Sequence, residues 1–202
     1  MKKFLMAALM FCGVVSASAQ SDLRFGVTGG MNVSNVTDLE SDCRIGFNIG
    51  ARLEYNFNKN VYFGTGLILS QKGMKEDYVD DDHVKVEAKG MPLYLQIPFQ
   101  IGGRYHLGNG VSLFGETGPY MAFGVGGKLK SEAKAGKISV EEKVDYFGDD
   151  AAEVFDMGWG LRAGVEVSNF QIHMGYEYGF TKVFEDTSCH NSNFNVGVSY
   201  FF

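Results

Sequence analysis

His173 is the side chain of this sequence best suited to acid/base chemistry, because it lies between two acidic residues, Glu166 and Glu177. A histidine acts as a general acid or base when a nucleophile lies within hydrogen-bond reach. No serine is obviously paired with this histidine. We therefore expect that the protein is not an enzyme; the alternative is a lipid-acting enzyme whose activity depends on His173.

Ionisable side chains recur on the polar, glycine-rich side of segments in which apolar and polar residues alternate. They are Arg24, Arg52, Glu54, Arg104, Glu116, Arg162, Glu166, His173 and Glu177. Counted from the nearest predicted turn, Arg52, Glu116 and Arg162 lie at similar heights, and Glu177 lies slightly higher, diagonal to Arg162. Charged groups that leave water are stable only when they are paired. We expect a salt-bridged network that fills a narrow lumen; the alternative is a gated ion path through the same charges.

Two acidic runs in polar stretches have ligand types that suit a divalent cation. Asp80-Asp81-Asp82 precedes His83, and Asp149-Asp150 precedes Glu153 and Asp156. A cation between such carboxylates and lipopolysaccharide phosphates is one interpretation, but the spacing matches no calcium-loop motif. We expect solvated loops, with no metal site and no cofactor.

Eight segments with a period of two must position these side chains, and that period is typical of strands with one apolar face. They cover roughly residues 24–33, 43–57, 61–72, 91–105, 111–127, 156–167, 170–181 and 193–202. Short and long connections alternate strictly, and the polar stretches 73–89 and 128–155 are expected to be long loops. This order predicts an all-β protein: an eight-stranded antiparallel transmembrane β-barrel with short periplasmic turns and longer extracellular loops. The alternative is a soluble eight-stranded barrel of the lipocalin type, with its apolar face inward.

Aromatic residues favour the membrane interpretation, because they gather at both ends of the segments. Near the short turns are Phe25, Tyr55, Phe57, Phe63, Tyr105, Phe170, Tyr200 and Phe202, and near the loops are Phe47, Phe123, Trp159, Tyr178, Phe180 and Phe194. Two aromatic belts are what a bilayer with two interfaces requires.

The first residues have the pattern of a secretory signal peptide. A basic start, Met1-Lys2-Lys3, precedes an apolar run and the small residues Ala17-Ser18-Ala19. We expect a signal peptide over residues 1–19, cleavage before Gln20, and a barrel domain over residues 20–202. The formal net charge of -6 argues against a nucleic-acid partner.

Two cysteines remain beyond the signal peptide, Cys43 in the first surface loop and Cys189 in the last. The first and eighth strands of a closed barrel are neighbours, and the periplasm is oxidising. We predict a Cys43–Cys189 disulfide; the alternative is two free thiols that lie too far apart to be joined.

The last ten residues form a strand with apolar residues on one face, ending at Tyr200 and Phe202. This ending resembles the C-terminal signature by which outer-membrane barrels are handed to the barrel-assembly machinery. If the resemblance holds, Tyr200 and Phe202 serve as an assembly signal, and that machinery is a partner during biogenesis.

The chain after the signal peptide resembles the small outer-membrane β-barrels known as the porin family, the outer membrane protein beta-barrel domain or PorT-like proteins. The resemblance is carried by Phe25-Gly26-Val27 with Gly29-Gly30, by Tyr94-Leu95-Gln96-Ile97-Pro98, where the family typically has Glu in place of Gln96, and by Tyr200-Phe201-Phe202. It implies a place in the outer membrane, surrounded by lipid and lipopolysaccharide. It implies no activity, because most members have none assigned.

These observations together predict a structural or surface-loop binding role, with a lumen plugged by side chains. Residues 128–155 are the expected contact region, because they form the longest and most charged of the predicted loops. One alternative is a small porin-like channel. Another is a PorT-like component of a secretion apparatus, which predicts a stable protein partner, although this chain is short for that branch.

Overall fold

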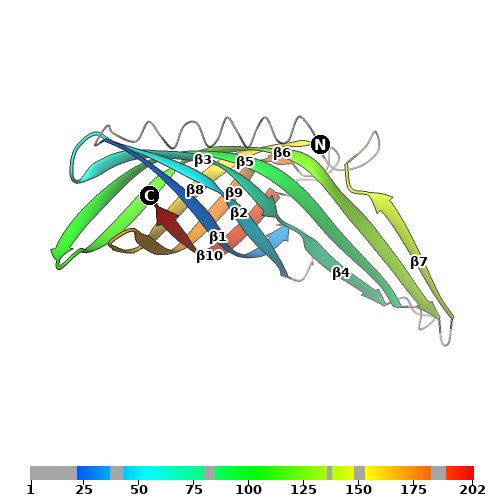
Figure 1. Cartoon of the computed structure of the whole chain (residues 1–202). Helices are drawn as coiled ribbons and strands as arrows, with labels where there is room; N and C mark the ends of the chain where they lie inside the picture. Colours follow the sequence, from blue (N-terminus) through cyan, green and yellow to red (C-terminus); the bar gives the residue numbers. More distant parts are fainter. Residues whose placement is uncertain (1–21, 37–42, 80–84, 136–137, 148–152, 183–189) are drawn as a thin grey trace, which may run out of the picture.

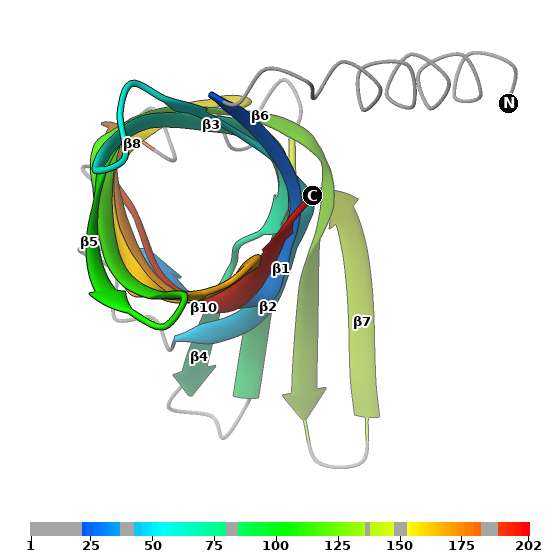
Figure 2. The ribbon, with the colours of Figure 1, turned by 60° about the vertical axis from the view of Figure 1, so that its left-hand side comes forward.

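A closed antiparallel barrel forms most of the computed structural model, which describes residues 22–36, 43–79, 85–135, 138–147, 153–182 and 190–202. Its strands are β1 (Leu23–Val36), β2 (Arg44–Asn56), β3 (Val61–Gln71), β5 (Lys85–Gly108), β6 (Val111–Ala135), β8 (Phe155–Val167), β9 (Phe170–Lys182) and β10 (His190–Phe201). Each pairs with its neighbours in that order, and β1 also pairs with β10, which closes the ring (Figure 2). The predicted eight-stranded antiparallel barrel is therefore confirmed; the predicted signal peptide lies outside the described residues.

Two further strands correct the expectation of long loops over residues 73–89 and 128–155. β4 (Met74–Val79) pairs with the first residues of β5, and β7 (Ile138–Asp145) pairs with the last residues of β6. β5 and β6 also continue to pair with each other there. We call this four-stranded sheet the extension: β4, residues 85–90, residues 128–135 and β7. It leads away from the end of the barrel opposite the short turns (Figure 1).

The prediction missed the extension because it relied on apolar residues at every second position. Strand pairing is made by backbone groups, so a polar stretch forms a ladder equally well where water covers both faces. β5 has 24 residues and β6 has 25, whereas about 9–11 residues cross a bilayer. The surplus length is what forms the extension.

A β-bulge marks the point where the extension leaves the barrel. The register between β5 and β6 shifts between Leu93 and Tyr94, so Val125 is left without an opposite residue. Such a bulge bends the strand and increases its twist. Gly127 follows with φ 146°, and a Cβ there would lie 2.6 Å from the Met91 oxygen. Glycine is therefore required at this bend.

Burial alternates along the barrel strands, with apolar side chains outward and polar side chains inward. Ile101, Leu161 and Ile172 are about three-fifths exposed, whereas Glu54 and Gln171 are fully buried. A soluble barrel of the lipocalin type would show the opposite arrangement, so that alternative is wrong. Among the described residues no helix is long and apolar enough to cross a membrane.

Gly102 tests how tightly the lumen is filled. The buried Tyr62 ring occupies the space that a Cβ on Gly102 would need, whereas the nearest atom to a Cβ on Gly103 would be 3.8 Å away. We expect Gly102→Ala to lower the free energy of unfolding by about 1–3 kcal/mol through overpacking. Gly103→Ala, on the outer face of the same strand, is the control. Equal urea denaturation of the two variants in lipid vesicles would contradict this account.

Candidate functional site

Charged side chains fill the lumen in three layers along the barrel axis. The lower layer, nearest the short turns, contains Arg24, Glu54, Arg104 and Glu166; the middle layer contains Arg52, Glu116 and Arg162; the upper layer contains Lys72, Asp156 and Glu177. Each residue lies on the inward face of its strand, because side chains of a strand alternate between the two faces.

The lower layer joins two arginines to two carboxylates. Arg104 pairs with Glu54 through one terminal nitrogen, and its Nε lies 3.1 Å from Glu166 Oε2. Arg24 lies 3.1 Å from the other oxygen of Glu166. The amide of Gln171 donates to Glu166 at 2.7 Å and to Glu54 at 3.2 Å. The layer is electrically balanced, as charges removed from water need to be.

The middle layer is centred on one fully buried carboxylate. Glu116 lies 2.9 Å from Arg52 and 3.0 Å from Arg162, and it accepts a hydrogen bond from the Tyr62 hydroxyl at 2.9 Å. The expectation that Arg52, Glu116 and Arg162 lie at one height is confirmed. Two guanidinium groups share one carboxylate here, so this layer has one positive charge in excess.

His173 belongs to the middle layer as a hydrogen-bond acceptor. Its Nδ1 lies 3.1 Å from a terminal nitrogen of Arg162. A guanidinium group can only donate, so Nδ1 accepts and Nε2 carries the ring hydrogen. Ser199 also contacts this nitrogen of Arg162, at 3.1 Å, and no hydrogen bond joins a serine to His173 within the described ranges. The arrangement orients Arg162.

The upper layer is built around Lys72, which the sequence analysis did not identify. Its Nζ lies 3.4 Å from Asp156 and 3.8 Å from Glu177. It also lies over the rings of Tyr120 and Tyr94, at 4.6 and 5.5 Å from their centroids. Such cation–π contacts favour a charge that is shielded from water. One lysine faces two carboxylates, so this layer has one negative charge in excess.

Asp156 corrects the expectation that the second acidic run is a solvated loop. The residue is buried, and its carboxylate accepts hydrogen bonds from Tyr120, Thr181 and Asn191 at 2.8–3.2 Å. Its position two residues before Gly158, on the inward face of β8, was the signal that could have found it. Residues 80–83 and 149–150 lie outside the described residues, and Glu153 is exposed.

Glu177 corrects the expectation of a diagonal pairing with Arg162. It accepts hydrogen bonds from Gln96 at 2.7 Å and from Asn193 at 3.1 Å, and its charged partner is Lys72. Diagonal placement on neighbouring strands was predicted correctly, but the long lysine side chain reaches the carboxylate from above.

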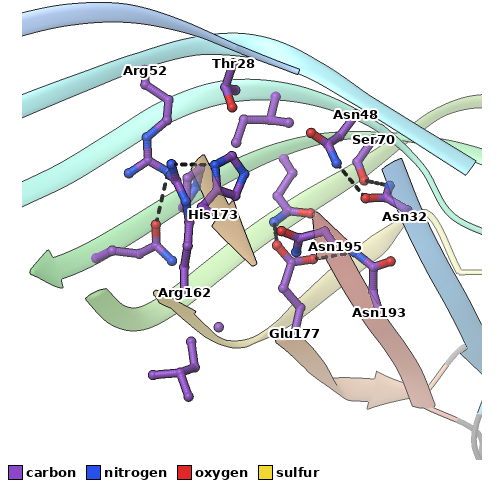
Figure 3. A pocket seen from close by; sticks show the side chains of 16 residues that line it. Thr28, Asn32, Asn48, Arg52, Ser70, Arg162, His173, Glu177, Asn193 and Asn195 are labelled. Carbon is purple, nitrogen blue, oxygen red and sulfur yellow. Dashed lines mark hydrogen bonds between the residues drawn. The ribbon is translucent and has the colours of Figure 1, made fainter. Parts of the chain in front are cut away.

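A small cavity separates the middle layer from the upper layer. Figure 3 shows Arg52, Arg162 and His173 on one side of it and Asn32 and Asn193 on the other. Its volume is about 40 Å³, which holds about three water molecules. Apart from this cavity, side chains fill the lumen at this depth.

Aromatic side chains cover the lumen above the upper layer. Phe147 packs edge-on against Tyr94, with ring centroids 5.4 Å apart, and against the cluster of Tyr94, Tyr120 and Ala122. Its ring occupies the space in which a Cβ on Gly124 would lie. The chain after β7 thus returns to the barrel and packs against its wall through Phe147, which the sequence did not reveal.

The predicted disulfide stays a prediction. Cys43 is exposed, and Cys189 lies outside the described residues. Arg44, next to Cys43, pairs with Ser34 of β1, and Ser34 pairs with Asn193 of β10. Strand β1 therefore lies between the two strands that the cysteines flank.

The proposed C-terminal assembly signal lies at the seam of the barrel. The amide of Phe202 donates to the Phe25 oxygen at 2.8 Å, and the ring of Tyr200 lies 4.8 Å from that of Phe170 and 5.3 Å from that of Phe202. The role of Tyr200 and Phe202 in assembly stays a prediction.

Glu116 is the residue whose loss should cost the most. Glu116→Gln leaves Arg52 and Arg162 buried without a counter-charge, so we expect the free energy of unfolding to fall by about 3–5 kcal/mol. The exposed Glu153→Gln, which removes the same charge, should change it by less than about 0.5 kcal/mol. Urea titration of the folded barrel in lipid vesicles measures both, and a small effect of Glu116→Gln would contradict the description of the middle layer.

Comparison with known proteins gives a family match over nearly the whole chain. Residues 4–202 match the family model described as outer membrane protein beta-barrel domain. Among curated proteins none matches this chain.

Solved structures similar to this chain include small surface barrels. Ail, the attachment invasion locus protein of Yersinia pestis, is 18% identical, with 90% of this chain and 99% of that chain covered and a TM-score of 0.38. Neisserial surface protein A is 14% identical, with 88% of this chain and 97% of that chain covered and a TM-score of 0.44. OprG from Pseudomonas aeruginosa is 12% identical, with 89% of this chain and 95% of that chain covered and a TM-score of 0.42. The family match, together with the closed barrel and its apolar outer face, identifies the chain as a member of the outer membrane protein beta-barrel domain family, located in the outer membrane.

Proposed function

We propose that this outer-membrane barrel has a structural and surface-binding role and contacts another macromolecule through the extension. The observation that carries the proposal is the extension itself: four strands continue the barrel at the end opposite the short turns. In outer-membrane barrels this end faces the outside of the cell. Such a sheet adds nothing to crossing the membrane, so its length points to contact outside it.

The filled lumen supports a role without ion conduction. Within each of the three charge layers, oppositely charged groups lie 2.9–3.8 Å apart or closer. The cavity of about 40 Å³ lies between the middle and upper layers. An eight-stranded barrel is just wide enough for its own side chains. A porin-like channel would need Glu116 and its two arginines to separate.

The position of His173 supports a role without catalysis. The ring is buried in the middle layer and accepts a hydrogen bond from Arg162. Acyl transfer needs a nucleophile beside the base and access for substrate, and neither accompanies this histidine among the described residues.

Contact through the extension can be tested by removing it. Replacing residues 129–145 by a two-residue Asn-Gly turn leaves the barrel strands intact, so we expect a folded barrel that has lost its cross-links to other surface molecules. Chemical cross-linking in native outer membranes, followed by mass spectrometry, measures this. Cross-links that persist, and that come from the periplasmic turns, would favour the secretion-apparatus alternative.

The absence of conduction can be tested in a planar bilayer. We expect the purified barrel to give no stepwise ion current, because the charge layers block its axis. The variant Asn195→Asp places a carboxylate in the wall of the cavity and serves as the control. Current steps whose size or ion selectivity changes in this variant would show that ions pass through the lumen.

A further inference from the structure

We propose that the free edge of β7 pairs with β7 of a second copy of this protein, in antiparallel orientation and centred on Glu142, on a facing membrane. This inference rests on the proposed role of the extension in surface contact. It names the partner: another molecule of the same chain.

The outer edge of β7 offers backbone groups for pairing. On its inner side β7 pairs with β6, and no strand pairs with its other side in the part of the chain that the structure describes. The amide of Tyr146 donates to the Gly127 oxygen and continues the register of β7 with β6. The backbone groups of residue 146 are therefore directed towards β6. Because backbone groups alternate between the two sides of a strand, those of residues 139, 141, 143 and 145 are directed to the open edge. An unpaired edge of this kind is a template for another strand.

The register of the extension places like charges in rows. One row across β4, β5, β6 and β7 contains Lys75, Lys89, Lys130 and Lys143, and the row two residues along each strand contains Asp77, Glu87, Glu132 and Glu141. Like charges directly opposite each other destabilise a sheet. Within the extension, therefore, Glu141 and Lys143 have like-charged residues opposite them on the β6 side.

A second β7 in antiparallel orientation reverses the order of these charges. With Glu142 at the centre, Glu141 of each copy lies opposite Lys143 of the other, and Val140 lies opposite Val144. Residues 141 and 143 are both directed to the open edge, so this register satisfies the backbone pattern. The one unfavourable pair in this register is Glu142 of one copy opposite Glu142 of the other. Moving the centre of the contact by one residue, to position 141 or 143, places Glu141 or Lys143 opposite itself.

The antiparallel orientation indicates where the second copy lies. A strand is antiparallel to its own copy only when the two-fold axis is perpendicular to it. Two copies in one membrane are related by an axis along the membrane normal, which would require β7 to lie flat in the membrane plane. The extension instead leads away from the end of the barrel (Figure 1). An axis in the membrane plane, as between facing membranes, meets the requirement.

β4 is the other edge of the extension and has a similar order of charges, with Lys75 and Asp77 on either side of Glu76. It has six residues, whereas β7 has eight. We assign the contact to β7 because the longer strand offers more pairs.

The test uses the full protein in vesicles of phosphatidylcholine, with clustering followed by dynamic light scattering. We expect wild-type vesicles to cluster, Glu141→Lys and Lys143→Glu each to weaken clustering at least about tenfold, and the double variant to restore it, because the swapped pair is again complementary. Glu142→Gln should strengthen clustering, since it removes the one repulsive pair. Glu153→Lys, which makes the same charge change away from β7, is the control.

Backbone pairing is tested separately from charge. Ser139→Pro removes an amide directed to the open edge without changing any charge, and an edge strand tolerates proline. We expect this variant to fold and to cluster at least about tenfold less. Unchanged clustering in Ser139→Pro, no restoration in the double variant, or loss only in Lys75→Glu would overturn the assignment to β7.

The outcome also distinguishes this inference from the proposed function. If wild-type vesicles do not cluster but replacement of residues 129–145 still abolishes cross-links to another surface molecule, the extension binds a different partner and self-pairing is wrong. If that replacement changes neither clustering nor cross-links, the role of the extension in contact is wrong as well.

Discussion

Closure between β1 and β10 is the constraint on which the rest of the structure depends. No water reaches the core of a bilayer, so every backbone group there must be paired within the protein. The pairing of Gly26 with Phe201 through to Val36 with Asn191 leaves the ring without an edge. Closure with eight strands also fixes the lumen at a width that side chains fill. The apolar outer face and the polar interior both follow from this one requirement.

The charges inside the lumen follow from its narrowness. Polar side chains are directed inward because the outer face meets lipid, and once inside they have little water, so they must satisfy one another. The lower layer is balanced by itself. The middle layer has an excess of positive charge around Glu116, and the upper layer has an excess of negative charge around Lys72, so the two excesses face each other across the small cavity. The polar residues that line this cavity give bound water a means of connecting the two layers.

The sequence was most informative where the period of two is long and apolar. It predicted the eight strands, their faces and the common height of Arg52, Glu116 and Arg162. It failed at the ends of the predicted segments 61–72 and 156–167, where Lys72 was not counted among the lumen charges and Asp156 was grouped with an acidic run of a loop. Their burial depends on the height in the barrel wall at which β3 ends and β8 begins, and strand pairing decides that height whereas local composition does not. The partner of Glu177 was missed for a related reason, since it depends on the reach of a lysine from another strand.

The extension shows what happens where the sheet is outside the bilayer and no longer has to close into a ring. Outside the bilayer, water satisfies unpaired backbone groups, so a sheet can end in open edges. Within that sheet, one row across the strands contains four lysines, and the row two residues along each strand contains four acidic residues. A strand added at the edge with the same order of charges would prolong the repulsion, whereas one with the reversed order would relieve it. An antiparallel copy of β7 has that reversed order, which is the physical basis of the proposed contact between two copies of the chain.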